Sequence, residues 1–119
     1  MARVTGIGGI FFRARDPDAL AAWYSTHLGI TQPDFAVWMQ DAGPTVFSPF
    51  KADTDYFAAD RQWMLNLRVD DLPAMIAGLR ASGVAVETRA DWDGDGSYGI
   101  FARIHDPEGT PIELWQPPA

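Results

Sequence analysis

One strand–helix pattern occurs twice in this chain, and the duplication limits the possible folds more than any other feature. Arg13 recurs as Arg68, 55 positions later. The same shift relates Asp16 to Asp71, each of which directly precedes an apolar, helix-like segment. Self-similarity at a fixed spacing indicates a duplicated supersecondary unit.

Each copy contains a helix with matching start and stop signals. Asp16 and Asp71 are good N-cap residues, and Pro17 suits the first helical position. Gly29 and Gly83 suit the position just after a helix. Apolar residues recur at helical spacing between these signals. The sequence therefore predicts one helix in each copy.

Short runs of strand-forming residues surround both predicted helices. One run leads into each helix, and an acidic connector, residues 51–61, joins the copies. We predict a single domain over residues 1–119, with one module at about 1–58 and another at about 59–119. The strand candidates that follow the helices are residues 37–40, 45–50, 84–89, 98–105 and 111–115.

Composition excludes several classes of protein. The net charge of −7 argues against a nucleic-acid partner, which normally requires a basic face. No apolar run reaches the length of a membrane helix, which is about 18 residues or more, and the first residues lack a signal-peptide pattern. The absence of cysteine excludes disulfides and thiolate metal sites. We therefore expect a cytoplasmic protein with no membrane and no nucleic-acid partner.

The second copy closes with HDPEGTPIELWQP, residues 105–117. A duplicated unit with this ending resembles the vicinal oxygen chelate superfamily of glyoxalases, bleomycin-resistance proteins and extradiol dioxygenases. The resemblance covers essentially the whole chain. It implies an α+β fold in which two βαβββ modules in tandem form a curved, cavity-bearing mixed sheet with helices on the outside. It also implies a homodimer, in which the modules could pair within one chain or across the two.

The resemblance further implies four metal-ligand positions, a His or Gln on the first strand of each module and a Glu on the last. At the matching positions this chain has Gly9, Met64, Phe47 and Glu113. A thioether is a poor ligand for hard divalent ions, and a catalytic metal generally needs at least three protein ligands. We therefore expect no metal and no cofactor at this site.

A second metal candidate is the segment DWDGDG, residues 91–96. Asp91, Asp93 and Asp95 alternate as in the opening of a calcium-binding loop. The twelfth position of such a loop, normally Glu, is Ala102 here. A polar, glycine-rich hairpin loop is the other interpretation, and the sequence leaves both open.

Glu113 is a carboxylate inside the apolar strand candidate 111–115. Because side chains alternate along a strand, Glu113 shares a face with Trp115, opposite to Ile112 and Leu114. The same alternation predicts a face with aromatic walls and a few polar groups, the usual composition of a small-molecule site. The predicted ligand-binding residues are Phe11, Phe47, Gln62, Met64, Asn66, Phe101, Arg103, His105, Glu113 and Trp115.

Two functions fit this face. The first is a metal-independent small-molecule-binding protein of the glyoxalase/bleomycin-resistance type, with an aromatic ligand. The alternative is a glyoxalase- or epimerase-like lyase, in which Glu113 is a general base or part of an atypical metal site and His105 is the acid. A structural interpretation also stays open, in which an arginine or water satisfies Glu113 and His105 bonds only to backbone.

Overall fold

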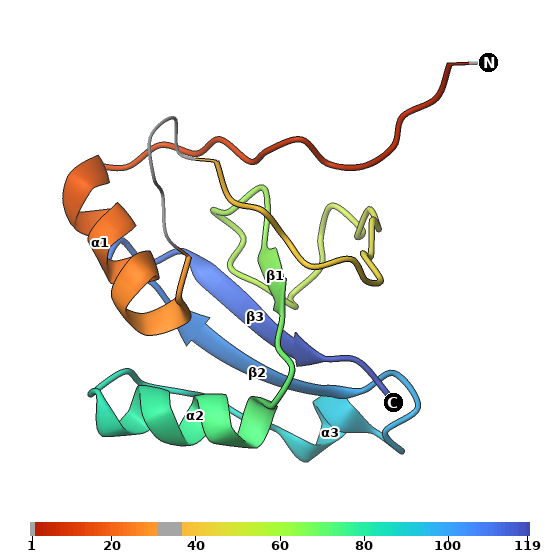
Figure 1. The fold of residues 1–119 in the computed structure, drawn as a ribbon. Coiled ribbons are helices and arrows are strands. Elements are labelled where there is room, and N and C mark those ends of the chain that lie inside the picture. Colours follow the sequence, from red (N-terminus) through yellow and green to blue (C-terminus); the bar gives the residue numbers. More distant parts are fainter. Residues whose placement is uncertain (1, 31–36) are drawn as a thin grey trace.

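The structure is a computed structural model that describes residues 2–30 and 37–119 (Figure 1). Three strands form one mixed sheet in the order β1-β3-β2, with β1 parallel and β2 antiparallel to β3. No helix in the described part of the chain is long and apolar enough to span a membrane. The elements are α1 (Pro17–Leu28), β1 (Leu65–Arg68), α2 (Leu72–Ala81), α3 (Ala90–Asp93), β2 (Ile100–His105) and β3 (Pro111–Gln116).

Both predicted helices are confirmed, together with their caps. The Asp16 carboxylate accepts a hydrogen bond from the Ala19 backbone N–H at 3.1 Å. The Asp71 carboxylate accepts one from the Ala74 N–H at the same distance, 3.1 Å. Each bond satisfies one of the amides that a helix leaves unpaired at its start. After α1, Gly29 adopts the left-handed conformation with φ 70°, as expected for a glycine stop.

The strands of the second copy form, whereas the described part of the first copy contains none. Strands β1, β2 and β3 lie where strand candidates were predicted, and residues 84–89 contribute a single bridge, Glu87 to Arg103. Residues 2–16, 37–40 and 45–50 form no strand. A strand requires a neighbour for its backbone groups, and these segments pair with no strand among the described residues. The structure thus shows a mixed α+β fold without showing the paired tandem modules.

The hydrophobic core lies between the sheet and the two long helices. Figure 1 shows α1 and α2 on one side of the strands and the connector on the other. Side chains from α1, α2 and one face of β2 and β3 meet there, so burial of apolar surface holds the helices on the sheet. The buried hydrophobic residues of this cluster are Leu20, Tyr24, Val69, Leu72, Leu79, Ala102, Ile104, Ile112 and Leu114.

The DPEG turn between β2 and β3 attaches helix α1 to the second copy. Asp106, only 4% exposed, accepts a hydrogen bond from the Tyr24 hydroxyl at 2.8 Å. The Glu108 carboxylate accepts bonds from the backbone N–H groups of Arg15 at 2.6 Å and Asp16 at 3.1 Å. These bonds hold the chain just before α1, so the most distinctive motif of the sequence joins the two copies.

Candidate functional site

The strand registers define a polar face opposite the core. Asn66 pairs with Glu113 in the parallel register, and Arg103 pairs with Glu113 in the antiparallel register. Directly paired residues point to the same face of a sheet, so these three side chains share one face. Phe101 and Trp115 are also paired, and their rings stack with centroids 6.5 Å apart and planes 11° apart. The face therefore carries an acid, an amide, a guanidinium and an aromatic pair.

Both carboxylate oxygens of Glu113 accept hydrogen bonds from side chains of this face. Asn66 donates its amide N–H to Oε1 at 2.7 Å, and the Tyr56 hydroxyl donates to Oε2. Glu113 is only 8% exposed. A buried carboxylate is costly unless donors satisfy it, and here two neutral donors do so. The structure thus assigns to Tyr56 and Asn66 the role that the sequence left to an arginine or water.

Tyr56 is a member of this site that the sequence analysis missed. It lies in the acidic connector, where neither strand nor helix periodicity marks it. Burial and the hydrogen bond to Glu113 raise the pKa of the Tyr56 phenol to about 12. At neutral pH the phenol therefore keeps its proton and acts as a donor. The available signal was an isolated aromatic pair, Tyr56 and Phe57, within a polar connector.

Arg103 is buried between two aromatic rings. Its guanidinium carbon lies 5.0 Å from the centroid of Tyr56 and 5.3 Å from that of Trp92, distances typical of cation–π contacts. Its Nη2 donates to the Tyr56 backbone carbonyl at 3.0 Å. Arg103 is 8% exposed, forms none of the ion pairs found among the described residues, and its Nε has no hydrogen-bond partner there. The guanidinium is thus held by aromatic faces and one carbonyl, and its buried Nε–H is unused.

The other predicted ligand-binding residues contribute less to the polar face around Glu113. Met64 is half-buried beside β1, whereas Gln62 and His105 are exposed. Phe11 and Phe47 are 97% and 80% exposed, so the single chain does not bring them to this face. Their predicted position depended on strands in the first copy, which the described residues do not form.

The chemistry of this face does not fit the metal site that the superfamily resemblance implies. A cation at Glu113 would have to displace the Asn66 and Tyr56 donors, and Met64 offers only a thioether. Among residues 2–30 and 37–119, no group of three or more His, Asp or Glu side chains is placed to hold a metal ion. We therefore derive no chemistry through a metal at Glu113.

The acidic loop of residues 91–96 uses two of its carboxylates to bond to backbone. Asp93 Oδ1 accepts a hydrogen bond from the Phe101 N–H at 2.9 Å, and Asp95 Oδ1 accepts one from the Ser97 N–H at 2.9 Å. The bonds from Ser97 lower the pKa of Asp95. The loop overlaps the short helix α3 and lies between the Glu87 bridge and β2, which is the arrangement expected of a hairpin loop.

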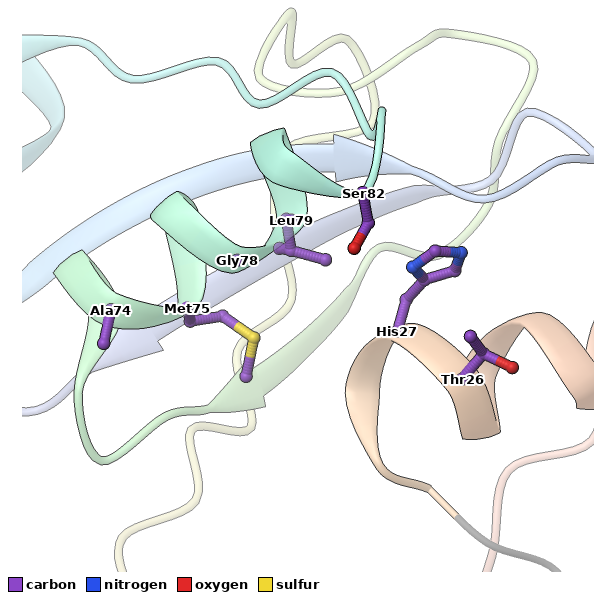
Figure 2. A pocket seen from close by; sticks show the side chains of 7 residues that line it. All are labelled: Thr26, His27, Ala74, Met75, Gly78, Leu79 and Ser82. Carbon is purple, nitrogen blue, oxygen red and sulfur yellow. The ribbon is translucent and has the colours of Figure 1, made fainter.

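A separate pocket of about 290 Å³ lies on the helical side of the sheet. Figure 2 shows His27 at the end of α1 facing the end of α2, where Ser82 follows the helix. His27 also packs against Trp23, with ring centroids 5.3 Å apart. The pocket is lined by Thr26, His27, Ala74, Met75, Gly78, Leu79 and Ser82, on the side of the sheet opposite Glu113.

Comparison with known families agrees with this geometry. A family described as glyoxalase-like domain matches residues 9–115, which is most of the 119-residue chain. The chain belongs to the glyoxalase-like domain family. This membership confirms the resemblance to the vicinal oxygen chelate superfamily. No curated protein sequence matches this glyoxalase-like chain.

Two solved structures resemble the glyoxalase-like protein over most of its length. TnmS3, an antibiotic binding protein from Streptomyces sp. CB03234, is 23% identical, with a TM-score of 0.60 over 99% of this chain and 100% of that one. A bleomycin resistance determinant encoded on the transposon Tn5 is 24% identical, with a TM-score of 0.50 over 89% of this chain and 92% of that one. At these identities the likeness shows the fold alone.

Proposed function

We propose that this glyoxalase-like protein binds a small aromatic molecule on the polar face of its sheet, without a metal. The observation that carries the proposal is the state of Glu113, whose two oxygens accept hydrogen bonds from Asn66 and Tyr56. The stacked pair Phe101 and Trp115 lies on the same face. Aromatic surface with a few fixed polar groups is the usual composition of a small-molecule site.

The descriptions of the related structures suggest which compounds to test first. One relative is described as an antibiotic binding protein and the other as a bleomycin resistance determinant. Planar or sugar-bearing antibiotics offer both aromatic surface and hydroxyl donors, which suit the Phe101–Trp115 stack and the Glu113 carboxylate. Antibiotics of this kind are therefore the first class of ligand to examine.

The proposal is tested by titrating the purified chain with planar aromatic compounds and sugar-bearing antibiotics, using calorimetry. We expect saturable binding of at least one compound, weakened about tenfold or more in Glu113→Gln because the charged acceptor is lost. Asp18→Asn is the matched control, since Asp18 is an exposed carboxylate on α1. Absence of saturable binding across the panel, or equal binding by Glu113→Gln, would contradict the proposal.

The geometry supports binding over acid–base catalysis by Glu113 and His105. Glu113 has a hydrogen bond on each oxygen, whereas His105 is exposed at the end of β2 and pairs in register with Pro111. No hydrogen bond joins Glu113 to His105 among those of the described residues. The two residues are thus not arranged as a coupled acid and base in the single chain.

The proposed assembly is a homodimer. Large apolar side chains are exposed along the described segments of the first copy, including Phe11 at 97% and Met39 at 85%. Exposed apolar surface that is contiguous typically marks an interaction site, and we propose that these side chains form such a surface. A second copy would supply the backbone partners that these strand-like segments lack, which makes it the occupant that the duplicated sequence favours.

A further inference from the structure

Tyr56 makes the contacts on the polar face that a bound aromatic ligand would make. Its hydroxyl donates to Glu113, and its ring lies beside the Arg103 guanidinium. Trp92 packs edge-to-face against the Tyr56 ring, with centroids 6.4 Å apart. Phe50, six residues earlier in the same chain, packs against Tyr56 with centroids 5.7 Å apart. A side chain from the connector thus occupies a site with a charged acceptor, a cation and aromatic walls.

The connector that carries Tyr56 is attached to the rest of the molecule by few polar bonds. Residues 51–61 form no helix or strand, and most of their side chains are exposed. Apart from the Tyr56 hydroxyl, the bonds that reach across to the β2–β3 hairpin are from Arg103 to the Tyr56 carbonyl and from Arg61 to the Glu108 carbonyl. Segments with few buried contacts open locally at low cost in free energy.

Tyr56 also fills the site incompletely. The Nε of Arg103 is buried and has no acceptor among the described residues, although a buried donor without a partner is destabilising by about 1–3 kcal/mol. The single oxygen of the Tyr56 side chain is bonded to Glu113, so Tyr56 leaves the Arg103 Nε unsatisfied. An aromatic compound that carries an additional oxygen acceptor could satisfy both Glu113 and Arg103.

We propose that Tyr56 is an internal substitute for the ligand, and that the ligand is a planar phenol with a second oxygen acceptor. The ligand displaces the connector, donates its hydroxyl to Glu113 and stacks on the aromatic side chains that now hold Tyr56. This inference rests on the proposed binding function and names the ligand class of that same site. The affinity for a ligand is accordingly reduced by competition with Tyr56.

The first test removes the tyrosine side chain and supplies it as a free molecule. In Tyr56→Ala, 4-methylphenol supplies the deleted phenol ring together with one additional methyl group, and we expect it to bind saturably and to raise the melting temperature. Toluene has the same ring and methyl group without the hydroxyl, and we expect it to bind about tenfold more weakly because Glu113 gains no donor. The wild-type protein should bind 4-methylphenol at least about tenfold more weakly than the variant, since its own ring fills the site.

A second variant keeps the test decisive if Tyr56→Ala does not fold. Tyr56→Phe keeps the ring and loses the bond to Glu113, so the connector competes less well. We expect 7-hydroxycoumarin, a planar phenol with carbonyl acceptors, to bind Tyr56→Phe about tenfold more tightly than wild type at slightly acid pH, where it is protonated. Coumarin, which lacks the hydroxyl, should bind each protein more weakly than 7-hydroxycoumarin does.

The outcomes separate this inference from the proposed function. Failure of 4-methylphenol to bind folded Tyr56→Ala, or equal binding of 7-hydroxycoumarin by wild type and Tyr56→Phe, overturns the inference. If the wild type nevertheless binds an antibiotic of the panel through Glu113, the proposed function stands without it. If the phenols bind as expected while the wild type binds no compound of the panel, the phenol site stands and the antibiotic assignment fails.

Discussion

At the scale of single residues, the site depends on how a carboxylate is satisfied inside a protein. Glu113 lies on a strand whose neighbours are apolar, and the donors Asn66 and Tyr56 offset the free-energy cost of burying its charge. Asn66 is adjacent in the sheet, whereas Tyr56 reaches Glu113 from 57 positions away in the chain. The acceptor is thus fixed by the sheet, and one of its donors is supplied by a segment outside it.

Alkaline pH should lower the free energy of unfolding, because it ionises the Tyr56 phenol. Because the pKa of Tyr56 in the folded state is raised to about 12, its stabilising effect is complete below the ordinary value of 10.0 and disappears as the pH rises from there to about 12. Tyr56→Phe should be less stable at pH 8 by about 1 kcal/mol, because the phenol is partly exposed and solvent screens the bond. Urea unfolding at increasing pH should show the difference between the two proteins shrinking over this range. A constant difference would contradict the assignment.

Gly99 is a position where no other residue fits. Its φ is +98°, and an added Cβ would lie 2.2 Å from the Gln116 carbonyl oxygen and 2.9 Å from Trp115 Nε1. We expect Gly99→Ala to lower the free energy of unfolding by about 2–4 kcal/mol, from backbone strain together with overpacking. Gly29→Ala is the matched control, because Gly29 also has a positive φ, +70°, but has nothing within 4 Å of the added Cβ. A similar loss in both variants in chemical denaturation would contradict the packing argument.

The residues of the polar face differ in how far sequence reasoning reaches them. Alternation along β2 and β3 is a local property, so one anchor such as Glu113 is enough to infer that Arg103 and Trp115 share its face. Tyr56 has no such periodicity, because its place depends on the path of an irregular connector. The aromatic cradle of Arg103 was likewise unpredictable, since Tyr56 and Trp92 come from two different loops.

At the scale of secondary-structure elements, the DPEG turn determines where α1 begins. Hydrogen bonds from the backbone amides of Arg15 and Asp16 lower the pKa of Glu108, and the bond from Arg15 has the larger effect. The free amides just before a helix favour a negative charge, and Glu108 supplies it from the other copy of the repeat. The motif that identifies the superfamily in the sequence therefore also has a structural role in this chain.

Acid should weaken the hydrogen bonds that hold the start of α1 to the Glu108 carboxylate. The pKa of Glu108 is lower in the folded state. Its contribution to folding stability is therefore present above the ordinary value of 4.5 and is lost as the pH falls below that value. Glu108→Gln should therefore reduce stability at neutral pH and make acid unfolding less steep. Hydrogen exchange of the α1 amides should be faster in Glu108→Gln, whereas Glu87→Gln, which changes an exposed carboxylate, should leave it unchanged. Unchanged exchange in Glu108→Gln would contradict this role.

The elements of the two copies were not equally predictable. The helices were predictable because caps and glycine stops act locally. Both helices begin directly after the expected aspartates. The strands of the second copy were predictable because they pair with one another in the sheet order β1-β3-β2. The described segments of the first copy have the same strand pattern, but they pair with no other segment that the structure describes. A strand pattern specifies a structure only when a second strand is available.

At the scale of the whole molecule, the unpaired first copy leads to a prediction about assembly. We expect a dimer in solution, because the exposed apolar side chains of the first copy need a covering surface. Light scattering after size exclusion should give twice the mass of one chain. Phe11→Ser combined with Phe47→Ser should shift the population toward monomer, whereas Asp18→Asn should not. A wild-type protein that is monomeric at high concentration would contradict the dimer.

We propose above all that side-chain donors, and not a metal, satisfy Glu113, which stands where the superfamily resemblance implies a metal ligand. Elemental analysis tests it most directly, with the untagged protein purified without chelator and measured before and after incubation with nickel, zinc, manganese, iron and calcium. The account predicts far less than one transition-metal ion per chain under both conditions, and no difference between wild type and Glu113→Gln. A transition metal bound at close to one ion per chain, and lost in Glu113→Gln, would contradict it.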